Sequence, residues 1–171
     1  MATYKSGFKK QSAEQMLLKV IIGIIIAVFA IVLVAFIYDI ATKNRYYSDY
    51  THITKYAEIM TQTDESIQIE DYIVYFYSGS CTACESIQKK ALREMAGIVK
   101  DGGKVFMVNT DNMTDREPKK AEFEDVIEEN LLVPSVVVVQ DGEYYEYVSS
   151  TTAVLELLES INDGAYEPFN E

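Results

Sequence analysis

The sequence has few basic residues for its length and far more acidic ones. Its 171 residues include 15 lysines and arginines against 27 aspartates and glutamates, which gives a formal net charge of −12. A protein that binds nucleic acid must present basic side chains to the phosphates. The charge balance therefore argues against a nucleic-acid partner.

Residue types that bind metals through nitrogen or sulfur are also scarce. The chain has two cysteines, Cys81 and Cys84, and one histidine, His52. A structural zinc site takes four ligands, so the two thiols and His52 would need a carboxylate to complete the set. We therefore expect no metal site, and we expect no cofactor other than the cysteine pair itself.

One long apolar run stands near the N-terminus. No charged residue occurs between Lys19 and Asp39, and the 19 residues Val20–Tyr38 would span about 28 Å as a helix, close to the bilayer core. A cleaved signal peptide has a shorter apolar region and small residues at its cleavage site. Because this run is longer and Asp39 follows it, we favour a retained transmembrane anchor over residues 19–40. A buried helix of a soluble domain is the other alternative.

The charges that flank this run predict an orientation. Four lysines precede it and two basic residues follow it directly, namely Lys5, Lys9, Lys10 and Lys19 before and Lys43 and Arg45 after. Cytoplasmic flanks carry the excess of basic residues in membrane proteins. We therefore expect residues 1–18 to form a cytoplasmic stub and the C-terminal domain to lie outside the cytoplasm, at the cell membrane.

The two cysteines have the spacing Cys-x-x-Cys and stand between an apolar strand-like run and a helix-like segment. Residues 85–100 are typical of a helix, so Cys81 falls at or just before a helix N-terminus. Unpaired N–H groups and the helix dipole favour a thiolate there. A thiolate attacks disulfides, and a second thiol can resolve the product. A structural disulfide would close only a very small loop and would stabilise little, although an inert, oxidised pair remains an alternative.

The rest of the chain alternates between strand and helix patterns. Apolar residues at spacings of three and four predict an amphipathic helix over residues 44–63, within a helical stalk at 41–65. The main domain, at 66–163, precedes a tail at 164–171. Its expected strands are 72–77, 104–109, 136–139 and 143–149, and its expected helices are 85–100, 118–130 and 151–161. Alternation of this kind implies a βαβ unit with parallel strands. His52 falls in the predicted stalk, away from the cysteines.

This order of elements resembles the thioredoxin family over about residues 69–163. One motif that carries the resemblance is Phe76-Tyr77-Ser78-Gly79-Ser80-Cys81-Thr82-Ala83-Cys84, and the other is Val133-Pro134-Ser135 followed by a valine strand and Gln140-Asp141-Gly142-Glu143. The resemblance implies an α/β thioredoxin fold, a mixed four- to five-stranded sheet flanked by helices, here preceded by one transmembrane helix. It also implies that Cys81 is the attacking thiol and Cys84 the resolving one. Val133 would offer its backbone to the substrate, and Pro134 would be cis.

The chain also departs from the family pattern. It lacks tryptophan entirely, so Ser80 stands where thioredoxins have tryptophan, and Thr82-Ala83 replaces their Gly-Pro. Tyr75 occupies the position where the family commonly has a buried carboxylate. Glu85, beside Cys84, is a candidate proton acceptor or a charge that raises the thiol pKa. Because of these departures, the direction of the redox chemistry stays open.

The resulting hypothesis is a membrane-anchored, extracytoplasmic thiol–disulfide oxidoreductase, with protein thiols and disulfides as substrates and a further redox partner. An alternative is an accessory or scaffold protein of the same fold, similar to some bacteriocin-transport accessory proteins, which fits a bacterial source. In that case a tyrosine-rich face would bind a partner at the membrane. The tyrosines concerned are Tyr46, Tyr47, Tyr50, Tyr144, Tyr145 and Tyr147.

Overall fold

The computed structural model describes residues 13–42, 46–64 and 67–166. The chain divides into two compact units, residues 1–42 and residues 43–171. The described part of the first unit is a single helix, whereas the second unit holds a sheet with helices packed on it.

The helix of the first unit is α1, Ala13–Thr42, and it is 30 residues long. Its stretch Gln15–Ala35 has a mean hydropathy of 3.2, so it is long and apolar enough to cross a membrane. A signal sequence would satisfy the same criteria of length and composition. Large apolar side chains are exposed all around this helix, which is the pattern of a helix suited to lipid rather than to the surface of a soluble domain.

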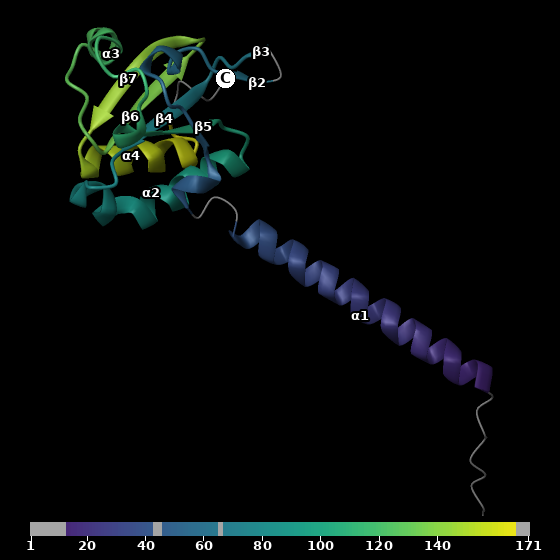
Figure 1. Cartoon of the computed structure of the whole chain (residues 1–171). Coiled ribbons are helices and arrows are strands. Elements are labelled where there is room, and N and C mark those ends of the chain that lie inside the picture. Colours follow the sequence, from purple (N-terminus) through teal and green to yellow (C-terminus); the bar gives the residue numbers. More distant parts are fainter. Residues whose placement is uncertain (1–12, 43–45, 65–66, 167–171) are drawn as a thin grey trace, which may run out of the picture. The chain divides into compact units, whose positions relative to one another are not determined.

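Five strands of the second unit form one mixed sheet in the order β1-β5-β4-β6-β7 (Figure 1). The strands are β1 (Thr51–His52), β4 (Tyr72–Tyr77), β5 (Val105–Asn109), β6 (Ser135–Gln140) and β7 (Glu143–Ser149). The central strand β4 is parallel to β5 and antiparallel to β6. Because β4 and β6 are buried on both faces, their sequences are apolar without alternation. A separate two-stranded ribbon pairs β2 (Thr63–Asp64) with β3 (Ile67–Gln68).

Helices cover both faces of the sheet. On one face α2 (Thr82–Lys100) and α4 (Thr151–Asn162) lie side by side, and α3 (Lys119–Ile127) lies on the other (Figure 1). The hydrophobic core on the side of α2 and α4, called here the α2-side core, contains Ile87, Ala91 and Met95 of α2 and Leu158 of α4. A second hydrophobic core, on the side of α3, contains Phe123 of that helix. The strand order, the mixed pairing and the two helical layers are those of the thioredoxin fold, which confirms the predicted fold class.

The predicted amphipathic helix over residues 44–63 is wrong for the residues that the structure describes. These residues form two 3-10 turns, η1 (Tyr47–Asp49) and η2 (Tyr56–Glu58), and between them the short strand β1. The apolar positions that are buried lie three residues apart, namely Tyr50, Ile53, Tyr56 and Ile59. A period of three suits 3-10 turns and extended chain, and over a short stretch it resembles the helical period of 3.6.

Parts of the predicted outer segments lie outside the described residues. These parts are residues 1–12 of the stub, residues 43–45 and 65 of the stalk, and residues 167–171 of the tail. Within the described part of the tail, the Tyr166 hydroxyl donates a hydrogen bond to Glu146 (2.6 Å). Its ring also packs edge-on against Tyr145, so this part of the tail is attached to β7.

Candidate active site

The two cysteines lie where the central strand passes into α2. Strand β4 ends at Tyr77, three residues make a turn, and Cys81 is the N-cap residue of α2. The Cys81 Sγ atom accepts a hydrogen bond from the Cys84 backbone N–H at 3.0 Å. One of the free N–H groups of the helix N-terminus is thus directed at the sulfur, and such a contact stabilises a thiolate.

Cys81 and Cys84 form a disulfide whose two sulfurs differ in their surroundings. Cys81 is half-buried, whereas Cys84 is only 2% exposed and lies on the same buried stripe of α2 as Ile87 and Ala91. The expected difference between an accessible first cysteine and an enclosed second cysteine is therefore present. A partner sulfur can approach Cys81 from the surface more readily than it can approach Cys84.

The loop before β6 lies against this disulfide. The Val133–Pro134 peptide bond is cis, and the Val133 carbonyl oxygen lies 3.5 Å from the Cys81 Sγ atom. The loop is held on both sides of Val133, because the Tyr147 hydroxyl accepts from the Leu132 N–H (2.8 Å) and the Ser135 hydroxyl donates to the Leu132 carbonyl (2.6 Å). The structure thus brings together Cys81, Cys84, Val133 and Pro134, which the sequence resemblance selected.

A carboxylate that the sequence reasoning did not select holds the turn before Cys81. Asp111 follows β5, and its Oδ2 accepts a hydrogen bond from the Gly79 N–H at 2.7 Å. The Ser78 hydroxyl lies 3.0 Å from both carboxylate oxygens. The only signal in the sequence is that parallel neighbouring strands end at the same edge of a sheet, so the residues after β5 meet the turn after β4.

Tyr75, which stands where the sequence resemblance would place a buried carboxylate, is fully buried. Its hydroxyl lies 3.4 Å from the hydroxyl of Tyr47. Burial raises the pKa of Tyr75 far above that of a free tyrosine. The side chain is therefore neutral and protonated at physiological pH, and it cannot accept a proton as a carboxylate would.

The two other candidates from the sequence are His52 and Glu85, and Glu85 directly follows Cys84. His52 is in β1 instead of a helix, with Nδ1 3.0 Å from the Tyr50 carbonyl and Nε2 2.9 Å from the Tyr77 hydroxyl. Glu85 is exposed on the first turn of α2. Within the described residues, no group of three or more histidine, cysteine, aspartate or glutamate side chains could hold a metal ion.

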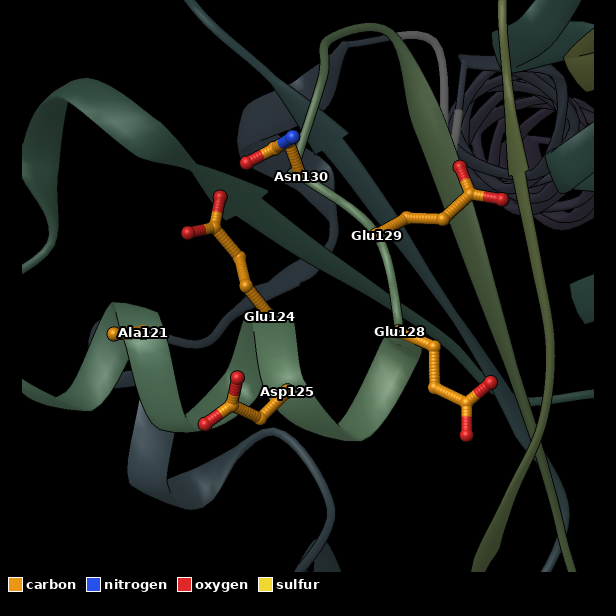
Figure 2. Close-up of a pocket in the computed structure, with 6 residues that line it drawn as sticks. All are labelled: Ala121, Glu124, Asp125, Glu128, Glu129 and Asn130. Carbon is orange, nitrogen blue, oxygen red and sulfur yellow. The ribbon is translucent and has the colours of Figure 1, made fainter.

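An acidic hollow of about 380 Å³ lies at the end of α3, and none of its lining residues belongs to the disulfide turn or to the Val133–Pro134 loop. Figure 2 shows that its carboxylates fan out in different directions rather than toward a common centre. The residues lining it are Ala121, Glu124, Asp125, Glu128, Glu129 and Asn130. The hollow therefore has no arrangement suited to chelating a cation.

No family model and no curated protein matches the sequence. Solved structures similar to the chain include the oxidised form of mitochondrial thioredoxin 3 from Saccharomyces cerevisiae, with 16% identity, a TM-score of 0.48 and coverage of 68% of this chain and 97% of that one. Thioredoxin from Trypanosoma brucei brucei has 14% identity and a TM-score of 0.48, and the match covers 71% of this chain and 95% of that one. Plasmodium falciparum thioredoxin has 21% identity and a TM-score of 0.43, with 64% and 97% covered.

Proposed function

We propose that this chain is a membrane-anchored thiol–disulfide oxidoreductase that exchanges disulfides with protein substrates through Cys81 and Cys84. The observation that carries the proposal is the disulfide itself, with its half-buried first sulfur at a helix N-terminus and its enclosed second sulfur. The Val133 carbonyl beside Cys81 supports it as well, because an extended substrate segment can align with backbone groups next to the reacting sulfur.

In the reducing direction the reduced protein reacts in two steps. The Cys81 thiolate attacks one sulfur of a substrate disulfide, forms a mixed disulfide, and releases the other substrate sulfur as a thiolate. The Cys84 thiolate then attacks the Cys81 sulfur, which restores the Cys81–Cys84 disulfide and releases the second substrate thiolate. Two electrons pass to the substrate, which takes up two protons. Oxidation of a substrate dithiol is the reverse sequence.

The surroundings of each sulfur suit its step. The Cys84 N–H, 3.0 Å from the Cys81 sulfur, and the positive end of α2 stabilise the Cys81 thiolate. Tyr75 stays protonated, since burial raises its pKa, so Cys84 loses its proton without help from that residue. This is a difference from relatives that carry a carboxylate there.

The proposal includes a membrane anchor with the domain outside the cytoplasm. The apolar stretch Gln15–Ala35 of α1 and the basic residues before it support this topology. A domain outside the cytoplasm meets an oxidising environment, in which proteins form and rearrange disulfides.

A turnover assay with the full-length protein in detergent micelles tests the proposal. Purified protein should reduce insulin disulfides in the presence of dithiothreitol, or should oxidise a reduced and unfolded disulfide protein, above the rate without protein. The matched control is Cys81→Ser, which keeps the fold and removes the attacking sulfur. Absence of exchange in both directions, with both thiols accessible to a titrating reagent after reduction, would contradict the proposal.

The alternative of a scaffold that binds through a tyrosine-rich face has less support. Tyr50 is buried, Tyr47 packs against the α2-side core, and Tyr147 holds the loop at Leu132. Only Tyr46 and Tyr145 among the six tyrosines are exposed. A double Cys81→Ser, Cys84→Ser variant that fully complements a deletion strain would favour the scaffold.

A further inference from the structure

We infer that Asp111 is a positioning residue for Cys81, and that its charge raises the pKa of the Cys81 thiol. The inference rests on the proposed thiol–disulfide exchange and adds a residue that sets its rate. Asp111 is in the 3-10 turn η3 (Thr110–Asn112), directly after β5. It is exposed at the edge of the sheet from which the Cys81 turn emerges.

The turn before Cys81 consists of Ser78, Gly79 and Ser80. The Asp111 carboxylate is hydrogen-bonded directly to the first two and is linked to Ser80 through the Ser78 hydroxyl. It accepts directly from Gly79 N–H and from the Ser78 hydroxyl. The Ser78 oxygen in turn accepts from the Ser80 N–H at 3.2 Å. Since the one Ser78 hydroxyl proton is directed at Asp111, the Ser80 hydroxyl, 3.1 Å away, donates to Ser78.

Asp111 is itself held in place. Its N–H donates to the Asn109 side-chain oxygen at 3.0 Å, and the Arg116 guanidinium donates to its carbonyl at 2.8 Å. The preceding Thr110 hydroxyl donates to the Tyr77 carbonyl at 3.3 Å. The end of β4 and the end of β5 therefore form one connected support, and a carboxylate bonded to N–H and O–H donors gives stronger hydrogen bonds than a neutral acceptor.

This arrangement has two consequences for Cys81. The N–H groups of Gly79 and Ser80 are bonded to Asp111 and Ser78, so they are not directed at the Cys81 sulfur, whereas that of Cys84 is. The Asp111 charge also opposes formation of a second negative charge on Cys81. Gly79 is two residues from Cys81, so at most about 7 Å of chain separates them and the Asp111 charge lies on the order of 10 Å from Cys81. At that distance in a water-like dielectric and at low ionic strength the effect is about 0.3 pKa unit.

Two variants separate the hydrogen bonds from the charge. Asp111→Asn keeps an oxygen that accepts from Gly79 and removes the charge, whereas Asp111→Ala removes both. For Asp111→Asn we expect the Cys81 pKa to fall by about 0.3 unit, a roughly twofold higher thiolate fraction below the pKa. For Asp111→Ala we expect kcat/KM for a disulfide substrate to fall about tenfold, because the turn loses its support.

The matched control is Asp115, an aspartate of the same loop with the same kind of bonds to a different segment. Its carboxylate accepts from the N–H groups of Tyr56 at 2.7 Å and Ala57 at 3.1 Å. Asp115→Asn and Asp115→Ala should therefore change stability while leaving the Cys81 pKa and kcat/KM within twofold of the wild-type values. This difference separates a specific role of Asp111 from general weakening of the loop.

The experiment uses the full-length reduced protein in micelles, with thiolate absorbance near 240 nm measured against pH in a Cys84→Ser background. This titration needs no substrate, so it tests Asp111 even if the wild-type protein turns over nothing, which would refute only the proposed function. A Cys81 pKa in Asp111→Asn that equals or exceeds that of the Asp115→Asn control would overturn the inference. Asp111→Ala protein that exchanges at the wild-type rate would overturn it equally.

Discussion

Replacing Gly97 by alanine tests how closely α2, the helix that carries both cysteines, packs against α4. A Cβ atom at Gly97 would lie 1.8 Å from the Asn162 Oδ1 atom of α4. Asn162 cannot stay in place, because its Cγ atom would also lie only 2.6 Å from the new carbon. The Nδ2 atom of the same amide donates a hydrogen bond to the Glu94 carboxylate at 2.9 Å. The new methyl group must therefore displace the amide and break this hydrogen bond.

The magnitude follows from two opposing effects. Glu94 is only 4% exposed, and losing a hydrogen bond to a buried charged group costs about 1.5–3 kcal/mol of unfolding free energy. Alanine gains about 1 kcal/mol over glycine in a helix. We therefore expect Gly97→Ala to lower the free energy of unfolding by about 1 kcal/mol.

The sign should reverse when Asn162 is absent. In an Asn162→Ala background the three atoms nearest to a Gly97 Cβ are gone and the Glu94 bond is already lost, so Gly97→Ala should stabilise by about 1 kcal/mol. The assay is urea unfolding of the four proteins of this cycle, followed by circular dichroism in the same micelles. Equal effects of Gly97→Ala in both backgrounds would refute the close α2–α4 contact as the cause.

Three further predictions address other parts of the chain. Asp115→Ala removes the acceptor for the N–H groups of Tyr56 and Ala57, so urea unfolding should show a loss of about 1–2 kcal/mol. Tyr75→Phe should leave the pH profile of exchange between pH 6 and 9 unchanged, because burial raises the Tyr75 pKa well above that window and the group stays protonated; a profile that shifts would show that Tyr75 titrates during exchange. A membrane-impermeant maleimide should label Cys81 in intact cells after reduction, and labelling only after lysis would place the domain in the cytoplasm.

The elements around the cysteines could be predicted from the sequence because each has a strong local pattern. The strand Tyr72–Tyr77 is apolar without alternation, and the buried stripe of α2 repeats at helical spacing from Cys84 onward. The hairpin between β6 and β7 follows from Asp141-Gly142, where both residues have positive φ angles. Local pattern and tertiary structure agree at these positions.

The helix prediction for the segment before β2 is wrong because the burial of this segment depends on tertiary contacts. Ile53 donates its N–H to the Met107 carbonyl of β5, and the Asp115 carboxylate holds Tyr56 and Ala57. Contacts with residues this far away in the sequence do not change the spacing of the apolar residues along the chain. A spacing of three therefore resembles that of a helix.

The contacts of Asp111 and His52 could not be predicted from the sequence either. Asp111 is one exposed acid in a polar loop, and nothing local distinguishes it from Asp115, which holds a different segment. His52 contacts Tyr77 across two strand pairings. The parallel pairing of β4 with β5 brings Asp111 to the turn before Cys81. The pairing of β1 with β5 and that of β5 with β4 together bring His52 to Tyr77.

The central claim is that Cys81 exchanges disulfides with protein substrates and that Cys84 resolves the product. Its most direct test is a Cys84→Ala variant expressed in the native cells, with free thiols blocked at lysis and adducts separated on non-reducing gels. We expect mixed disulfides with other proteins that disappear on reduction and are absent from the Cys81→Ala, Cys84→Ala control. A Cys84→Ala protein that accumulates no adduct beyond this control would contradict the exchange through Cys81.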